Sequence, residues 1–314
     1  MDKNGGFFSV LFLMILLVSL CYSGYYLYQY WPREPVTLNR ISVDEQTINI
    51  ENNIPSKQFY ERMRYSDKII SYFIASSCSS KNSESIIRAM RNLENLTILS
   101  FKEKIESKAE LKILCSNVAP KAGEENHFVA GEGGPSKILN STLYSVILEG
   151  KIALYREESC PESKVATHEL LHALGFNHNN NSGSIMYPIL KCNQQIDEEI
   201  INSINKLYAV KSLPDLVIYT SNATKSGRYL NFHIEVLNQG LIFSGPVEIE
   251  IYANDKFVER FDMGAISIGS RKLLDVENLK IPNYANKIDF RVDVQNLIEE
   301  IDEQNNEVVL QINP

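Results

Sequence analysis

The sequence has little of what marks several classes of protein. Its 314 residues include one tryptophan, five histidines and five cysteines, too few for a disulfide-scaffolded chain, and no Cys-x-x-Cys pair of the kind that binds structural zinc. It also lacks any long basic run, and its 31 lysines and arginines are outnumbered by 39 aspartates and glutamates, so no nucleic-acid partner is expected. The remaining composition, 44% hydrophobic and 22% charged, fits one large or two ordinary globular domains.

One long uncharged run lies at the N-terminus. No charged residue occurs between Asn4 and Pro32, and an apolar stretch there leads into a cluster of tyrosines and a tryptophan. A helix of this length can cross about 30 Å of hydrocarbon, and Tyr and Trp suit the headgroup interface. The pattern predicts that residues 1–33 form a membrane anchor with one transmembrane helix, and that residues 34–56 are a linker. Everything that follows is predicted to be exported. A cleaved signal peptide is the alternative, although no A-x-A-like cleavage site follows the run.

Residues 57–211 mix strand-like runs with helical periodicity, which predicts an α+β domain. The expected strands are Ile69–Ile74, Leu96–Phe101, Leu111–Leu114, Tyr144–Leu148 and Lys151–Tyr155, and the expected helices are Ser83–Asn95 and Pro161–Leu174. Residues 119–136 contain four glycines and two prolines and are expected to form a loop. Their Gly-Glu-Gly-Gly run is not a phosphate-binding loop, because no Gly-Lys-Ser/Thr closes it.

Residues 214–314 change to a period of two. Apolar residues alternate along Tyr229–Leu237, Val247–Ile251 and Lys287–Val294, as in strands with one buried face. About seven such runs are separated by turn residues, which is the outline of a small all-β, Ig-like sandwich.

The residues that can carry chemistry are concentrated in one short stretch. His168 and His172 are four residues apart, so both imidazoles lie on one face of a helix and can bind one ion. Gly175 can end that helix with a positive φ, which allows His178 to approach as a third ligand. Three protein ligands leave one position open for water, the catalytic arrangement of zinc. Glu169 is placed to take the proton of that water as general base and to return it as general acid.

This stretch and the later run Ser184–Pro188 resemble the metzincin zinc endopeptidases. The resemblance is closest to the matrixin branch, because Tyr187 and Pro188 directly follow Met186. It implies one catalytic Zn²⁺, with Met186 beneath it as an apolar floor that does not bind the metal. It implies that Tyr187 and Pro188 form the wall of the pocket for the residue after the scissile bond.

The same resemblance implies a closing helix over Ile196–Tyr208 and a strand near Ser145–Tyr155 that binds extended substrate by edge pairing. Other features of the branch do not transfer. No propeptide cysteine motif precedes Ile69, and structural zinc and calcium sites have no ligand set, because His127 is the one histidine of this domain outside the motif. His127 is therefore expected to be a surface residue.

Four cysteines lie outside the N-terminal run. In an exported domain, a bridge between Cys160 and Cys192 would clip the zinc site, and Cys78–Cys115 would be the other pair. Four cysteines allow three pairings, and spacing alone does not choose among them.

The C-terminal part resembles the cell-adhesion-related (CARDB-type) sandwich modules of prokaryotic surface proteins. The resemblance rests on Pro-Asp-Leu-Val-Ile at its start, on Val236–Gly240 and on Ile301–Glu307. It implies a domain that binds a surface ligand or acts as a spacer.

The sequence as a whole predicts a membrane-anchored, exported zinc endopeptidase that acts on protein or peptide substrates. Two alternatives stay open. One is a surface adhesion protein with a vestigial zinc domain, against which the presence of Glu169 speaks. The other is a zinc-dependent amidase that acts on non-protein bonds, although the Met-turn favours peptides.

Overall fold

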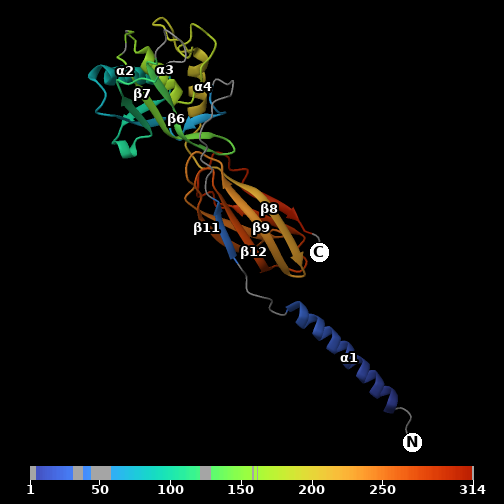
Figure 1. The fold of residues 1–314 in the computed structure, drawn as a ribbon. Coiled ribbons are helices and arrows are strands. Elements are labelled where there is room, and N and C mark those ends of the chain that lie inside the picture. Colours follow the sequence, from blue (N-terminus) through green and yellow to red (C-terminus); the bar gives the residue numbers. More distant parts are fainter. Residues whose placement is uncertain are drawn as a thin grey trace.

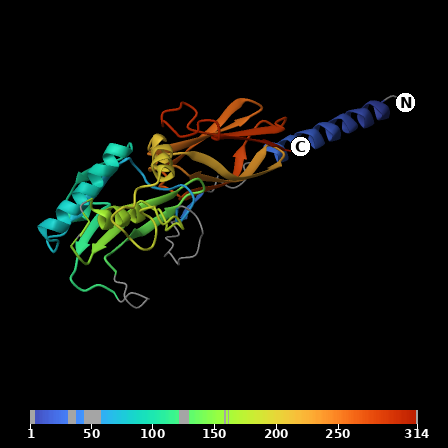
Figure 2. The ribbon, with the colours of Figure 1, turned by 90° about the horizontal axis from the view of Figure 1, so that it is seen from above.

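The computed structural model describes residues 5–30, 38–43, 58–120, 129–157, 159–160 and 162–312. An α+β unit and a β-sandwich lie end to end, and the chain between them is short (Figures 1 and 2). Two separate apolar cores, one in each unit, support this division.

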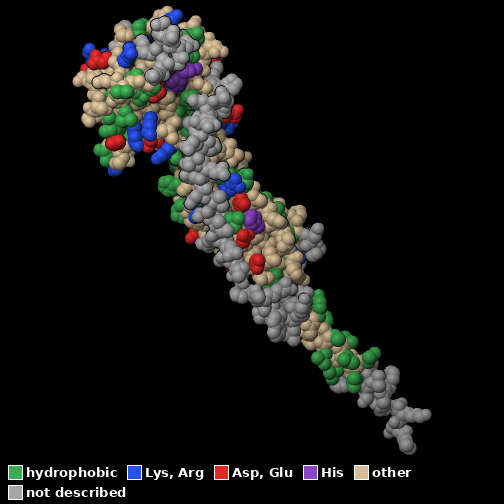
Figure 3. Space-filling model, viewed as in Figure 1, with side chains coloured by type: hydrophobic (Ala, Val, Ile, Leu, Met, Phe, Trp, Pro, Cys, Tyr) green, Lys and Arg blue, Asp and Glu red, His purple; other side chains and the backbone are tan. Residues whose placement is uncertain are grey.

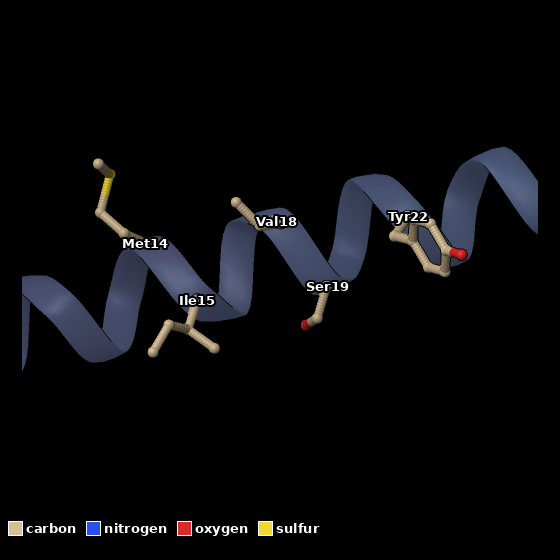
Figure 4. A pocket seen from close by; sticks show the side chains of 5 residues that line it. All are labelled: Met14, Ile15, Val18, Ser19 and Tyr22. Atoms are coloured by element: carbon tan, nitrogen blue, oxygen red, sulfur yellow. The ribbon is translucent and has the colours of Figure 1, made fainter.

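The N-terminal helix α1 (Gly5–Tyr30) carries no charged residue in its first or last turn. Within the described ranges, no helix is both long enough and apolar enough to span a bilayer. The predicted membrane anchor over residues 1–33 is therefore not supported. Met14, Ile15, Val18, Ser19 and Tyr22 line an apolar pocket on the surface of α1, and Figure 4 shows their side chains. Because α1 alone lines it, this pocket is not a candidate active site.

The α+β unit is built on a six-stranded sheet in the order β2-β7-β5-β3-β4, with β6 also paired to β7. The strands are β2 (Met63–Tyr65), β3 (Ile69–Ile74), β4 (Ser100–Glu103), β5 (Leu111–Cys115), β6 (Gly131–Asn140) and β7 (Ser145–Leu154). All pairings are parallel except the antiparallel pair of β6 and β7. β2 and β5 pair with different halves of β7, whereas β6 pairs with its whole length. β6 therefore takes the other side of β7 and forms the edge of the sheet.

Three α-helices and one 3₁₀ turn complete this unit: α2 (Ser80–Leu96), η1 (Glu106–Lys108), α3 (Lys164–Ala173) and α4 (Glu198–Ala209). The apolar face of α2 is buried in the same core as Leu170 of α3 and Ile113 of β5. Ser79 caps α2, since its side chain accepts a hydrogen bond from the backbone N–H of Asn82. The buried face of α3 fixes which of its side chains point to the site described below.

The structure confirms some of the predicted elements and contradicts others. The strand Ile69–Ile74 is confirmed with its predicted bounds. The expected loop over residues 119–136 is wrong in its described C-terminal part, because β6 begins at Gly131. The two strands expected around Glu149 and Gly150 are one strand, β7. Gly150 does not make a turn; a Cβ there would lie 2.2 Å from the hydroxyl of Tyr65, so glycine is required by packing.

The predicted edge strand is also wrong. The strand near Ser145–Tyr155 is β7, which has partners on both sides, whereas β6 has a free side among the described residues. The active-site helix starts at Lys164, because Ser163 adopts a left-handed conformation immediately before it; Pro161 lies outside the described residues. The closing helix was expected over Ile196–Tyr208 and is α4.

The sandwich confirms the predicted all-β C-terminal region. Its two sheets have the orders β1-β12-β9-β8 and β11-β10-β13-β14. The strands are β1 (Leu38–Val43), β8 (Leu216–Ser226), β9 (Tyr229–Asn238), β10 (Pro246–Ala253), β11 (Lys256–Ala265), β12 (Arg271–Lys280), β13 (Lys287–Val292) and β14 (Glu307–Gln311). β1 was not predicted: it comes from the expected linker and pairs antiparallel with β12, from Leu38 opposite Val276 to Val43 opposite Arg271.

Candidate metal centre and active site

Three histidines converge at one point. α3 places His168 and His172 one turn apart, and Gly175, with a φ of +94°, turns the chain so that His178 faces them. Their Nε2 atoms are 3.0 Å (His168 to His172), 3.1 Å (His172 to His178) and 3.2 Å (His168 to His178) apart. Tetrahedral ligands at about 2.0–2.1 Å from zinc are separated by roughly 3.3 Å, so the residues fit such an ion. In the described part of the chain, no other three His, Cys, Asp or Glu residues lie this close together.

Backbone carbonyls hold two of these rings in the orientation that metal binding needs. Nδ1 of His168 donates to the carbonyl of Ile185 at 2.6 Å, and Nδ1 of His172 donates to the carbonyl of Phe176 at 2.7 Å. A hydrogen on Nδ1 leaves a lone pair on Nε2, the atom that points to the centre. The ring of Phe59 stacks on His172 at 5.9 Å and shields that side of the centre.

Burial favours the neutral form of all three imidazoles. Burial lowers the pKa of His168 to about 4 and that of His172 to about 3, and it also lowers the pKa of His178. Neutral imidazole is the form that binds a metal ion. His178 is partly covered but is the most exposed of the three, and histidine side chains of this unit reach the molecular surface in Figure 3, so the centre is open to solvent.

Glu169 is the buried carboxyl group next to the first histidine. Burial, with a smaller contribution from the charge of Glu132, raises the pKa of Glu169 to about 8. The Glu132 carboxylate accepts a hydrogen bond from the hydroxyl of Tyr155 at 2.6 Å. Sequence reasoning missed both of these neighbours, because they come from β6 and from the end of β7.

The glycines of β6 allow its backbone to lie against α3. A Cβ on Gly131 would be 2.7 Å from Cγ of Glu169, and a Cβ on Gly133 would be 2.2 Å from the carbonyl oxygen of Glu169. Real Cβ atoms do not approach other atoms so closely. The Gly-Glu-Gly-Gly run therefore brings the free edge of β6 beside Glu169, a role that its composition alone did not indicate.

Met186 is fully buried, and a network of polar side chains holds its turn in place. Its N–H donates to the hydroxyl oxygen of Ser184 at 3.0 Å, and its carbonyl accepts from the N–H of Asn179 at 2.9 Å. The Ser184 hydroxyl donates to Asp197, and the side-chain amide of Asn179 donates to that hydroxyl at 2.8 Å. Asp197 stands at the N-cap of α4 but makes no capping hydrogen bond, because its carboxylate is directed at this turn instead.

Tyr187 and Pro188 follow the turn, half-buried and exposed respectively. The Tyr187 N–H donates to the carbonyl of Ser184 at 3.2 Å. No hydrogen bond or ring contact among the described residues joins the Tyr187 side chain to the histidines, so its role in a substrate pocket stays a prediction.

The structure contains both expected disulfides. Cys160–Cys192, with Cα atoms 5.3 Å apart, joins the segment before α3 to the segment after the Met186 turn. Cys78–Cys115, with Cα atoms 4.8 Å apart, joins the start of α2 to the end of β5. His127 lies outside the described residues.

Comparisons with known proteins find two families. The matrixin profile matches residues 64–209 and the CARDB profile matches residues 213–309. Interstitial collagenase B of Mus musculus is 24% identical over 228 residues, which cover 69% of this chain and 45% of that protein. The chain thus spans less than half the length of this curated relative.

Two similar solved structures each match 32% of this chain. They are a CARDB domain from Pyrococcus furiosus, determined in complex with di-metal ions (18% identity, TM-score 0.28, 90% of that chain), and a domain of a putative cell surface protein from Methanosarcina acetivorans (18% identity, TM-score 0.29, 93% of that chain).

Proposed function

Since residues 64–209 are a matrixin domain and residues 213–309 are a CARDB domain, we propose that this protein is a zinc endopeptidase in which Glu169 acts as general base and acid. One observation carries the proposal: three neutral imidazoles direct their Nε2 atoms at one point, 3.0–3.2 Å apart, beside a buried carboxyl group. His168, His172 and His178 would hold the ion, and the open position of such a site is the one that catalytic zinc uses.

When bound, zinc supplies polarisation of the substrate carbonyl and a lowered pKa for a water molecule. The chain supplies the proton transfers. Glu169 accepts the proton that the attacking water loses and then donates it to the leaving amine. Burial raises the pKa of Glu169 to about 8, and a neighbouring positive charge would lower this pKa, which favours a group that serves as base and then as acid.

The free edge of β6 would bind the substrate. An extended peptide can add to this edge as a further strand, with backbone hydrogen bonds giving affinity. Gly131 and Gly133 place that edge next to Glu169, so a peptide bond paired there lies near the proposed base. Tyr187 and Pro188 are proposed to form the wall of the pocket for the residue after the scissile bond.

We also propose that the protein works outside the cell. The two disulfides fit an oxidising compartment, and the CARDB domain supports a location at a surface. A ligand at that surface, bound by the sandwich, is the proposed second partner beside the peptide substrate.

The test is cleavage of an unfolded protein by the full, zinc-loaded chain. Chelation should abolish cleavage, and Glu169→Gln should lower kcat by about 10²–10⁴-fold while the zinc content is unchanged. Glu84→Gln, at an exposed position on α2, is the matched control and should cleave as the wild type does. Full activity of Glu169→Gln would refute the assignment of the base. No cleavage by zinc-loaded wild type would favour the surface-binding alternative.

A further inference from the structure

The β6–β7 hairpin reaches from the active site to the sandwich. At one end, Gly131 and Gly133 lie against Glu169. Nine residues beyond Gly131, roughly 30 Å away at about 3.3 Å per residue, β6 ends at Asn140. The turn that follows is next to the β-sandwich (Figure 1).

Polar and apolar contacts join this turn to the sandwich. The Ser141 hydroxyl donates to the carbonyl of Gln239 at 2.9 Å. Tyr144 and Val146 form a small buried apolar cluster with Leu241. This cluster is separate from the cores of the two units, and Val146 and Leu241 are fully buried in it. The start of β7 is therefore packed against the C-terminal domain rather than exposed.

Gly269 is fitted to the same hairpin. Its φ is +68°, and a Cβ there would lie 2.6 Å from Cδ2 of Leu139 and 3.2 Å from the carbonyl oxygen of Asn140. A side chain at this position would therefore require Leu139 to shift where the loop before β12 approaches the end of β6. Leu139 is itself 3% exposed.

Two further contacts fix the sandwich on the α+β unit. The Ser212 hydroxyl donates to the carbonyl of Ser66 at 2.5 Å, and the ammonium of Lys211 lies 2.6 Å from the carboxylate of Glu299. The Lys211–Glu299 ion pair is exposed and contributes little to the free energy of association. The apolar cluster and the fit at Gly269 therefore dominate the interface.

From these contacts we propose that the C-terminal sandwich is a brace for β6 and so a positioning part of the substrate site. This rests on the proposed function, in which β6 binds the peptide. Among the described residues, β6 has a strand partner on one side only, and such an edge strand is more rigid when both of its ends are held. α3 holds the active-site end and the sandwich holds the other end. A substrate that pairs with β6 then meets a strand already held in one position, which lowers the entropy lost on binding.

Gly269→Ala in the full chain tests the brace, with Gly245→Ala as the matched control. Both glycines lie in the sandwich with a positive φ, +68° and +77°, so both substitutions strain the backbone alike. A Cβ at Gly245 meets nothing within 4 Å, whereas a Cβ at Gly269 meets the hairpin. Hydrogen exchange of the β6 amides should be about tenfold faster in Gly269→Ala alone. KM for a peptide that extends along β6 should rise about tenfold, with kcat and zinc content unchanged.

The double variant Leu139→Ala and Gly269→Ala should restore slow exchange of the β6 amides and a low KM. The reason is that Leu139→Ala removes Cδ2, the atom nearest to the new methyl group at position 269. Equal β6 exchange in Gly269→Ala and Gly245→Ala would overturn the brace, as would faster exchange with an unchanged KM. If the wild type cleaves no peptide, the proposed function fails, and the exchange comparison still decides whether the sandwich holds β6.

Discussion

At the scale of single residues, the two imidazoles on α3 are oriented before any ion arrives. Each donates its Nδ1 hydrogen to a fixed backbone carbonyl, Ile185 for His168 and Phe176 for His172. A ligand that is already in the right tautomer and rotamer loses little entropy when it binds a metal. The chain therefore provides a preformed centre, and changes near it should act on zinc affinity as well as on turnover.

Gly133→Ala tests the close contact between β6 and α3. The new methyl group would lie 2.2 Å from the carbonyl oxygen of Glu169 and 2.8 Å from its carbonyl carbon, so strand or helix must move. The free energy of unfolding should fall by about 1–3 kcal/mol, and zinc should bind more weakly. Gly134→Ala is the control on the same strand, since a Cβ there meets nothing within 4 Å. Urea unfolding and zinc titration of both variants check this, and equal behaviour would contradict it.

Glu300 gives the sandwich a dependence on pH. Burial raises the pKa of Glu300 to about 7, although its carboxylate accepts hydrogen bonds from the Leu216 N–H and the Asn306 amide. Its ordinary value is 4.5. The folded-state pKa of Glu300 is higher than its pKa in the unfolded chain, so the protonated carboxyl group stabilises the folded state. This contribution to the free energy of unfolding is complete below pH 4.5 and is lost as the pH rises through about 7.

Wild type should therefore lose stability relative to Glu300→Gln between pH 5 and pH 8, by on the order of 2 kcal/mol. Urea unfolding at the two pH values measures the difference. Glu277→Gln, at an exposed position of β12, should show the same pH dependence as the wild type. A constant difference between wild type and Glu300→Gln would refute this prediction.

At the scale of elements, the start of α4 stabilises the segment that follows the metal centre in the sequence. Asp197 holds the Ser184 hydroxyl, and the same short segment carries Met186 and the Ile185 carbonyl that orients His168. Asp197→Ala should weaken zinc binding by up to about 10–100-fold, because it frees the segment whose Ile185 carbonyl orients His168. Glu198→Gln, one residue further on and exposed, should leave zinc affinity unchanged. A competitive zinc titration decides between these outcomes.

The two disulfides close loops of similar length, 32 and 37 residues apart in sequence. From the entropy of loop closure, replacing either pair by serines should lower the free energy of unfolding by about 3–4 kcal/mol. Only the pair Cys160–Cys192 connects the two segments that flank the centre. Its loss should weaken zinc binding as well, whereas loss of Cys78–Cys115 should leave zinc affinity unchanged in protein that is still folded. Equal zinc affinity of the two variants would contradict this assignment.

Sequence reasoning succeeded where the signal is local. His168, Glu169 and His172 lie within one turn of a helix, and Gly175 sets the direction of the chain towards His178, so the spacing alone predicts convergence. The strand Ile69–Ile74 has its own dense β-branched pattern and was predicted with its observed bounds.

It failed where pairing between distant segments decides the structure. β6 is rich in glycine, which weakens a strand taken alone, yet antiparallel pairing with β7 stabilises it. The pattern predicts two strands with a break at Glu149 and Gly150, because the reason for a glycine there, the hydroxyl of Tyr65, comes from a strand far away in sequence. Asp197 and Glu132 carry no motif, so only the folded chain brings them to the site.

At the scale of the whole molecule, the α+β unit and the sandwich are joined by contacts as well as by the chain. The buried cluster of Tyr144, Val146 and Leu241 makes the two units one body at this point. A domain expected to act only as a surface binder or spacer thus also lies against the strand that is proposed to bind substrate. Variants of the sandwich should therefore be assayed for KM as well as for binding.

The pairing of β1 with β12 also affects the order in which the two units can fold during synthesis. β1 is synthesised before the whole α+β unit, and its partner strand is among the last segments of the chain. The α+β unit can complete its own core before the strand that pairs with β1 has been synthesised. The sandwich is finished only when almost the entire polypeptide has been made, and its first-made strand then pairs with a strand that lies beyond the whole α+β unit in the sequence.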